Sequence, residues 1–304
     1  MPESLWLPPP FFDGASRAGL ETTLADVMPE ARRSSISGVT IRELLTHTSG
    51  IPLIDTGWPH STWSESFDRI CRVNSLVPGS AYQPQSTWFL LGEILQRLDA
   101  DHRPFRSILT EDVLVPMGID EAWCGLAESQ VAGLVDRLPQ FSVSERGEIS
   151  TSEFSSKPWL TQPSPGGNFC GPVRQLGRFY EMLLHNGRTS FGEAVLSPET
   201  VANMTSAHRT DRFDDTMQHI VDLGLGLFLD SNRHGQKSVP YGFGKYCSPE
   251  TFGHGGAQCA MGFCDPVHKL VVAWAANGFC SEPQHQRRNR GMNEAIYEDL
   301  DLFS

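Results

Sequence analysis

The stretch Thr40-Ile-Arg-Glu-Leu-Leu-Thr-His-Thr-Ser-Gly50 combines a helix start with a polar string that ends in glycine. Thr40 stands three residues before Glu43, which is the spacing of a capping box at the start of a helix. Two leucines follow and give the helix apolar contacts, so the pattern predicts a helix over residues 39–46. His47 then lies just past the helix C-terminus, in a polar string that ends in glycine.

Helical periodicity continues on the C-terminal side of this stretch. Over residues 86–98 and 173–184, apolar side chains recur every three or four positions, which places them on one helix face. Ser197 followed by Pro198 is typical of an N-cap and a first helical residue. The predicted helices cover residues 39–46, 64–73, 86–98, 105–114 and 173–184, with one more starting at Ser197 and a closing one over 293–302. Residues 120–170 are expected to be mostly irregular.

Beyond about residue 220 the apolar residues recur at every second position. Leucines alternate from Leu223 to Leu229, and a second alternation runs from Cys259 to Phe263, which is typical of strands. The unbroken apolar run over residues 270–275 suits a strand that is buried on both faces. Because helices come first and strands last, the fold class is predicted to be α+β.

Composition excludes several classes of protein. The chain has 304 residues, enough for one large domain or two close subdomains. With a net charge of −12, the chain lacks the basic surface that is typical of a nucleic-acid-binding protein. No apolar run approaches the roughly 20 residues that span a bilayer, so no membrane span is expected.

Cysteine usage and the N-terminus bear on location. The seven cysteines are irregularly spaced and include no Cys-x-x-Cys, which argues against a zinc ribbon or a disulfide framework. Buried thiols in a reducing compartment are the simplest interpretation. Residues 1–12 contain Pro8-Pro9-Pro10 and no basic segment followed by an apolar one, so they do not form a signal peptide. The sequence as given is therefore predicted to be cytoplasmic.

Several well-known site motifs are absent. There is no His-x-x-x-His or His-Glu-x-x-His spacing, no phosphate-binding loop, and no Gly-x-Ser-x-Gly elbow of an α/β-hydrolase. We therefore expect no metal and no other cofactor.

Two segments together carry a family resemblance: residues 40–50, and Phe252-Gly-His-Gly-Gly-Ala257 with its continuation to residue 278. The sequence resembles the serine β-lactamase-related family, which groups class C β-lactamases, penicillin-binding proteins, D-aminopeptidases and esterases. Further family-like strings occur in the right order: Pro78-Gly79, Leu90-Leu-Gly-Glu-Ile94, Val115-Pro-Met-Gly118, Ser164-Pro-Gly-Gly167, Leu183-Leu-His-Asn-Gly187 and Leu196-Ser-Pro-Glu-Thr200. The resemblance covers roughly residues 20 to 280.

The resemblance implies the β-lactamase and DD-peptidase type of α+β fold, a helical region beside an antiparallel sheet region. Residues 1–30 would be an irregular N-terminal remnant, residues 31–215 the mainly helical region, and residues 216–304 the strands and final helix of the sheet region. The family's N-terminal strands and nucleophile helix are expected to be missing. The strand over residues 270–275 would then be a sheet edge, through which the chain is expected to form a homo-oligomer.

The family's His-x-Gly motif is matched by His254-Gly255-Gly256. The resemblance implies that His254 donates a hydrogen bond to substrate, that Gly255, Gly256 and Ala257 bind substrate, and that the Ala257 amide stabilises an oxyanion. Outside this motif, a buried histidine beside a glycine turn would be the simpler interpretation.

The family's Tyr-x-Asn motif is damaged. Tyr82-Gln83-Pro84 is the nearest match, but Pro84 replaces the asparagine and cannot supply a side-chain hydrogen bond. If the match to the motif is shifted by one residue, Gln85 stands at the asparagine position, but the tyrosine position no longer holds a tyrosine. Tyr82 therefore remains a candidate catalytic base, and a packed loop aromatic is the alternative.

The family's Ser-x-x-Lys motif, in which the serine attacks a carbonyl, is missing. The residues three positions before the four lysines are Phe154, His234, Gly242 and Pro266, never serine. The strings Gly19-Leu20, Asp26 and Pro29-Glu30 match the family's sequence after the nucleophile helix, so the motif would fall at or before Met1. Ser4 and Ser16 have no lysine partner. His47 and Ser49 are expected to brace the cleft, and Cys170 to be a buried thiol, rather than to be catalytic.

The implied ancestral function is that of a metal-free serine hydrolase that acts on an ester, amide or β-lactam through an acyl-enzyme. The partner would be a small-molecule or peptide-like substrate. Two classes remain open. The chain is either an enzyme whose given sequence starts too late, or a non-catalytic binding protein or decayed paralogue. In both cases residues 1–304 are expected to be inactive.

Overall fold

The computed structural model describes residues 18–303, except residues 135, 139 and 146–147. Ser4 and Ser16, and most of the predicted irregular N-terminus, lie outside the described residues. Within the described ranges, no helix is long and apolar enough to cross a membrane.

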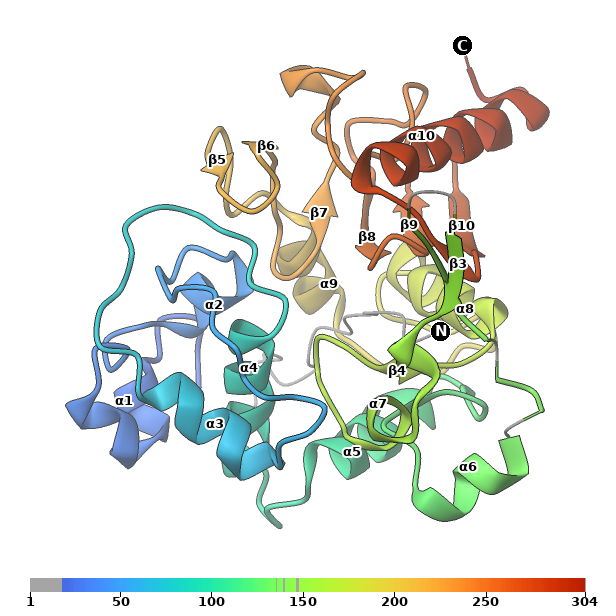
Figure 1. The fold of residues 1–304 in the computed structure, drawn as a ribbon. Coiled ribbons are helices and arrows are strands. Elements are labelled where there is room, and N and C mark those ends of the chain that lie inside the picture. Colours follow the sequence, from blue (N-terminus) through green and yellow to red (C-terminus); the bar gives the residue numbers. More distant parts are fainter. Residues whose placement is uncertain (1–17, 135, 139, 146–147, 304) are drawn as a thin grey trace.

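A four-stranded antiparallel sheet lies in the C-terminal third of the chain (Figure 1). Its order is β10-β9-β8-β7, and its strands are β7 (Phe228–Leu229), β8 (Phe252–Gly256), β9 (Ala260–Asp265) and β10 (Leu270–Ala275). Across β8 and β9, His254 pairs with Gly262. The predicted strands over 259–263 and 270–275 are thus confirmed, and β10 is an edge strand among the described residues.

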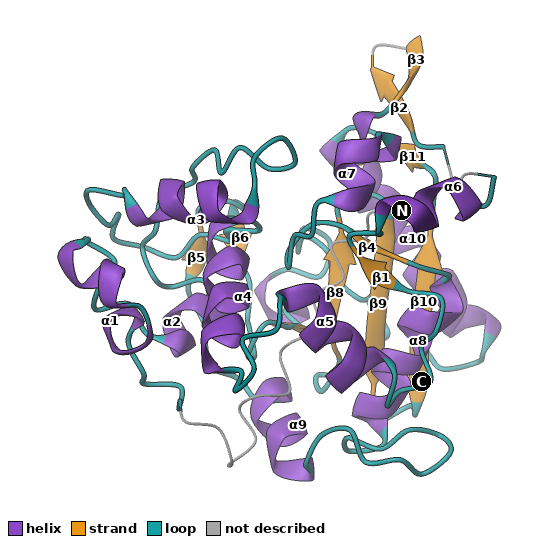
Figure 2. Ribbon diagram, turned by 90° about the horizontal axis from the view of Figure 1, so that it is seen from below, coloured by secondary structure: helices purple, strands orange, loops and turns teal. Residues whose placement is uncertain are grey.

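Helices cover both faces of this sheet (Figure 2). Neighbouring residues of β10 show the arrangement, because side chains of a strand alternate between its faces. Ala273 lies beside α8 (Val173–Leu184), whereas Trp274 donates its indole N–H to Asn293 of α10 (Glu282–Asp299) at 2.9 Å. α8 lies in the predicted helical region but packs on the sheet.

Four helices form a second body beside the sheet (Figure 1): α1 (Leu24–Val27), α2 (Ile41–Leu45), α3 (Trp63–Cys71) and α4 (Ser86–Leu98). Helix α5 (Phe105–Ile108) with its π-helical continuation over Leu109–Leu114, and α9 (Pro198–Thr205), instead pack in the same apolar cluster as α8 and the sheet. Short 3-10 turns cover Pro29–Arg33, Glu153–Ser155 and Asn232–His234. The predicted capping box is confirmed, because Glu43 accepts from the Thr40 amide at 2.8 Å and Thr40 accepts from the Glu43 amide at 3.2 Å.

Residues 120–170 contain more regular structure than expected. The segment holds β1 (Trp123–Cys124), α6 (Glu128–Leu134), β2 (Ser142–Glu145), β3 (Glu148–Thr151), α7 (Lys157–Thr161) and β4 (Phe169–Cys170). β2 also pairs with β11 (Gly278–Phe279), and β5 (Phe213–Asp214) pairs with β6 (His219–Ile220). Elements of two to seven residues are too short to show a periodicity, which is why the sequence pattern missed them.

The predicted strand over Leu223–Leu229 is wrong for most of its length. The Gly224 amide bonds the Leu227 carbonyl at 2.9 Å, so the segment folds into a turn, and Gly226 has a positive φ of 75°. Leu223, Leu225 and Leu227 are buried, but each belongs to a different apolar cluster. The alternation therefore reflects burial in three directions, not one strand face.

The closing helix begins eleven residues earlier than the predicted start at residue 293. Its buried stripe is largely polar, since His285, Asn289, Asn293 and Tyr297 recur at intervals of four and are buried. Asn289 and Asn293 both donate to the Gly242 carbonyl, at 2.8 and 3.0 Å. A search for an apolar stripe could not find this part of the helix.

Candidate active site

A cavity of about 490 Å³ lies where β8 meets the loop of residues 80–85, here called the Tyr82 loop. Its wall includes His254, Gly255, Gly256 and Ala257, together with Tyr82. The structure therefore brings together every site residue that the sequence predicted. We call this space the His254 cavity.

His254 is buried in β8, and its hydrogen bonds set its tautomer. Nδ1 lies 2.7 Å from the Gly255 carbonyl oxygen, which can only accept, so Nδ1 carries the hydrogen. Burial lowers the pKa of His254 to about 4, so the imidazole is neutral at pH 7. Nε2 is then an acceptor, not the donor that we expected from the family resemblance.

Tyr82 supplies the hydrogen that Nε2 accepts. Its hydroxyl lies 3.4 Å from His254 Nε2, a long contact for such a bond. Burial, together with the negative charge of Asp214, raises the pKa of the phenol, although a hydrogen bond with Trp88 opposes this. Tyr82 therefore stays protonated and does not fit the role of a catalytic base at neutral pH, which favours the alternative of a packed loop aromatic.

Three successive amides of the Tyr82 loop are fixed by residues distant in sequence. The Ala81 amide donates to the His47 carbonyl at 3.2 Å, and the Gln83 amide to His47 Nδ1 at 3.2 Å. The Tyr82 amide donates to Asp214 Oδ1 at 3.1 Å. The His47 ring also packs edge-on against Tyr82, with ring centroids 4.6 Å apart. His47 thus braces the loop, as expected.

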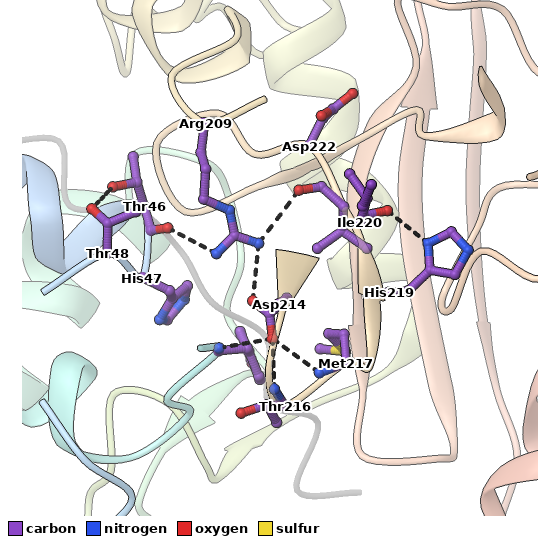
Figure 3. A network of polar contacts seen from close by, with 12 residues as sticks. Thr46, His47, Thr48, Arg209, Asp214, Thr216, Met217, His219, Ile220 and Asp222 are labelled. Atoms are coloured by element: carbon purple, nitrogen blue, oxygen red, sulfur yellow. Dashed lines mark hydrogen bonds and ion pairs between the residues drawn. The ribbon is translucent and has the colours of Figure 1, made fainter. Parts of the chain in front are cut away.

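Asp214 is the centre of a buried network (Figure 3). Its Oδ1 also accepts the amides of Thr216 and Met217, at 3.0 and 2.9 Å. Its Oδ2 accepts from Arg209 at 2.9 Å, and neither side chain of this ion pair is more than 1% exposed. Arg209 also donates to the Thr46 carbonyl at 3.2 Å. The end of α2 and the Tyr82 loop are therefore held by one charge pair.

The two residues offered for the asparagine position of the damaged Tyr-x-Asn motif lie in different surroundings. Pro84 lines the His254 cavity, whereas the Gln85 side chain accepts from Thr56 at 3.0 Å. Of the two, only Pro84 is on the cavity wall, and proline offers no side-chain hydrogen bond there.

Sequence reasoning missed several residues of the cavity wall. Ser238 lies 3.1 Å from His219 Nε2, and His219 Nδ1 faces the Ile220 carbonyl at 2.7 Å. Glu282, at the start of α10, and Gln286 also line the cavity. None of these belongs to a motif, and each comes from a segment whose proximity depends on the fold.

Other candidates lie away from the cavity wall. Ser49 is buried and accepts from the Ile51 amide at 3.4 Å. Cys170 is buried and lines a different cavity, and none of the seven cysteines, all of which are described, is in a disulfide. Lys157 and Lys245 pair with surface glutamates. Within the described ranges, no cluster of three or more His, Cys, Asp or Glu could hold a metal ion.

Comparison with known proteins places this geometry in context. The model of the family described as Beta-lactamase matches residues 15–296. A search of curated proteins finds no match.

Solved structures share the fold. A penicillin-binding protein homologue from Caulobacter crescentus is 24% identical, with a TM-score of 0.67 over 93% of this chain and 77% of that one. A family VIII carboxylesterase is 19% identical, with a TM-score of 0.70 over 91% and 77%. Simvastatin synthase from Aspergillus terreus is 17% identical, with a TM-score of 0.66 over 93% and 78%. The predicted fold class is therefore confirmed.

Proposed function

The chain belongs to the Beta-lactamase family, and from this premise we propose that its His254 cavity binds an ester, amide or β-lactam without hydrolysing it. The observation that carries the proposal is the cavity itself. His254, Tyr82 and residues 255–257 come from distant segments and line one space of about 490 Å³, a size that suits a small ligand. The similar carboxylesterase supports an acyl compound as the ligand class.

The same site argues against turnover by these 304 residues. No lysine has a serine three residues before it, so the family's nucleophile and base pair is absent from the sequence. Tyr82 is a protonated phenol and cannot take its place as a base. Removing the nucleophile of a serine hydrolase costs about 10⁶-fold in turnover, so we expect these 304 residues to bind the ligand without turnover.

A second candidate function is a serine hydrolase in which a Ser-x-x-Lys comes from residues outside these 304. The complete His254-Gly-Gly-Ala segment on the cavity wall favours it, because a binding protein has no need of an oxyanion site. The DNA upstream of the Met1 codon discriminates between the two candidates. An in-frame Ser-x-x-Lys supports the hydrolase, and an in-frame stop codon excludes it.

The proposed function is tested with one ester, one anilide and one β-lactam on purified residues 1–304. Calorimetry should detect binding of at least one compound, and p-nitrophenyl acetate should give no burst of product. His254→Leu, which removes the hydrogen-bond partner of the Tyr82 hydroxyl at the cavity wall, should weaken that binding, whereas His60→Leu, at an exposed position, should not. Absence of binding by all three compounds, or turnover of any, would contradict the proposal.

A further inference from the structure

The His254 cavity has an uneven distribution of charge. Among the described residues that line it, Glu282 is the only acid, and there is no lysine or arginine. His254 is neutral at pH 7, because burial lowers its pKa to about 4. The cavity therefore presents one carboxylate and no cation to a ligand.

The described partners of Glu282 are neutral. Gln286 donates to Oε1 at 2.5 Å and Gln258 donates to Oε2 at 3.0 Å. Arg288 lies nearby on α10, but it donates to the carbonyl oxygens of Gln258 and Gly278. The positive end of the α10 dipole offsets part of the Glu282 charge. Each carboxylate oxygen can still accept a further hydrogen bond, because an ionised carboxylate offers about four acceptor sites.

Aromatic rings lie in the same wall as Glu282. Tyr82, Phe228 and Tyr241 all line the cavity. A Cβ at Gly255 would collide with the Tyr241 ring, so the glycine lets this ring lie directly against β8. Glu282 also acts electrostatically on this ring, because burial and the negative charge of Glu282 together raise the pKa of the Tyr241 hydroxyl. A carboxylate beside aromatic faces attracts ammonium groups through charge and through cation–π contact.

We propose that the ligand of the His254 cavity carries an ammonium group, seated between Glu282 and the Tyr241 ring, with its acyl part toward residues 255–257. This inference rests on the proposed acyl-binding function and narrows its ligand class. Ligands that carry a carboxylate are disfavoured, because Glu282 would repel them and no cation of the described wall would bind them.

Two esters of the same shape test the charge preference. Acetylcholine and 3,3-dimethylbutyl acetate differ only in a quaternary nitrogen replaced by carbon. Calorimetric titration of residues 1–304 should show acetylcholine binding about tenfold more tightly, which is about 1.4 kcal/mol. Glu282→Gln should remove this preference, and Glu282→Asp, which keeps the charge, should retain part of it.

The matched control is Glu298→Gln, which makes the same charge change at the other end of α10. It should leave the preference unchanged, and melting curves should show all variants folded. Equal or tighter binding of the neutral ester, or an equal effect of both glutamine variants, overturns the inference while the acyl-binding function stands. If neither ester binds and the ester, anilide and β-lactam also fail, the proposed function fails, and this inference with it.

Discussion

His254 combines a buried position with a fixed tautomer, and both follow from its place between β8 and the Tyr82 loop. The Gly255 carbonyl holds the hydrogen of Nδ1, and the Tyr82 hydroxyl faces Nε2. Protonation of this ring would place an uncompensated charge in the interior, which is why its pKa falls to about 4.

This lowered pKa makes folding sensitive to acid. Above pH 6.5 His254 is neutral in both states. Between pH 6.5 and 4 the unfolded chain binds a proton that the folded chain does not, so the free energy of unfolding falls as the pH falls. The shift corresponds to about 3 kcal/mol from this residue. His254→Gln should therefore flatten the dependence of stability on pH in urea melts between pH 7 and 4.5.

The control for this prediction is His60→Gln, because His60 is exposed. It should leave the slope of stability against pH unchanged. Asp265, whose pKa is lowered by hydrogen bonds from Ser248, His268 and Tyr297, loses its contribution below about pH 4, outside this window. Equal slopes for the wild type and His254→Gln would show that His254 is not neutral in the folded chain.

Ser238 provides the most direct test of the absence of a nucleophile. It is an exposed serine on the cavity wall and contacts a histidine, His219, at 3.1 Å. We predict that a fluorophosphonate probe does not label residues 1–304 stoichiometrically at any serine, because Ser238 lacks the paired lysine of the family's motif. Peptide mass spectrometry measures this. A full label at Ser238 that His219→Ala abolishes would identify a different nucleophile and contradict the binding-only proposal.

At the scale of elements, the Arg209–Asp214 pair joins α2 to the Tyr82 loop. Removing one partner of a buried pair leaves the other charge without compensation, which costs about 3–5 kcal/mol. We therefore predict that Arg209→Met lowers the free energy of unfolding by that amount in urea melts.

The matched control is Arg137→Met. The Arg137 side chain is 60% exposed and pairs with Glu121 on the surface, so its loss should cost less than about 1 kcal/mol. Similar losses in the two variants would show that Asp214 is stabilised by its amide donors alone.

Sequence patterns located the elements that depend on local capping residues or on a buried apolar stripe. The predicted ranges of α4 and α8 agree with the structure, because both helices bury an apolar stripe on the body of the protein. α10 was predicted only in its C-terminal part, since its buried stripe is polar, and the leucines from Leu223 were wrongly assigned to a strand. Periodicity reports which side chains are buried, but not which partner buries them.

In the candidate site, too, the sequence predicted some residues and missed others. His254 and Tyr82 were found because they lie in strings typical of the family, and the structure brings them to one cavity. Asp214, Ser238 and Glu282 were missed, because their roles depend on contacts across long sequence separations. The tautomer of His254 could not be predicted from the motif for the same reason, since a neighbouring carbonyl decides it.

At the scale of the molecule, the edge of the sheet governs association. β10 pairs with β9 alone among the described residues, while α8 and α10 cover its faces. The strand Leu270–Ala275 carries no charge, and only Lys269 stands at one end. Such an edge recruits a second strand. We therefore predict that residues 1–304 form an oligomer, or are poorly soluble, in multi-angle light scattering.

A lysine at the other end of the strand tests this prediction. Ala275 is exposed, so Ala275→Lys should reduce the oligomer at equal protein concentration. Ala207→Lys, which adds the same charge at an exposed position outside the sheet, should not. A wild-type chain that remains monomeric over the whole concentration range would show that this edge is protected.

The position of Asp214 also affects how the protein can evolve. Its carboxylate holds both the Tyr82 loop and the amides of Thr216 and Met217, which line the same cavity. A mutation here is therefore subject to selection for folding as well as for the ligand. A lineage that no longer needed the ligand would still keep the aspartate, and with it the shape of the cavity wall. In a mutant library screened only for soluble protein, Asp214 should remain invariant while Glu282 drifts freely.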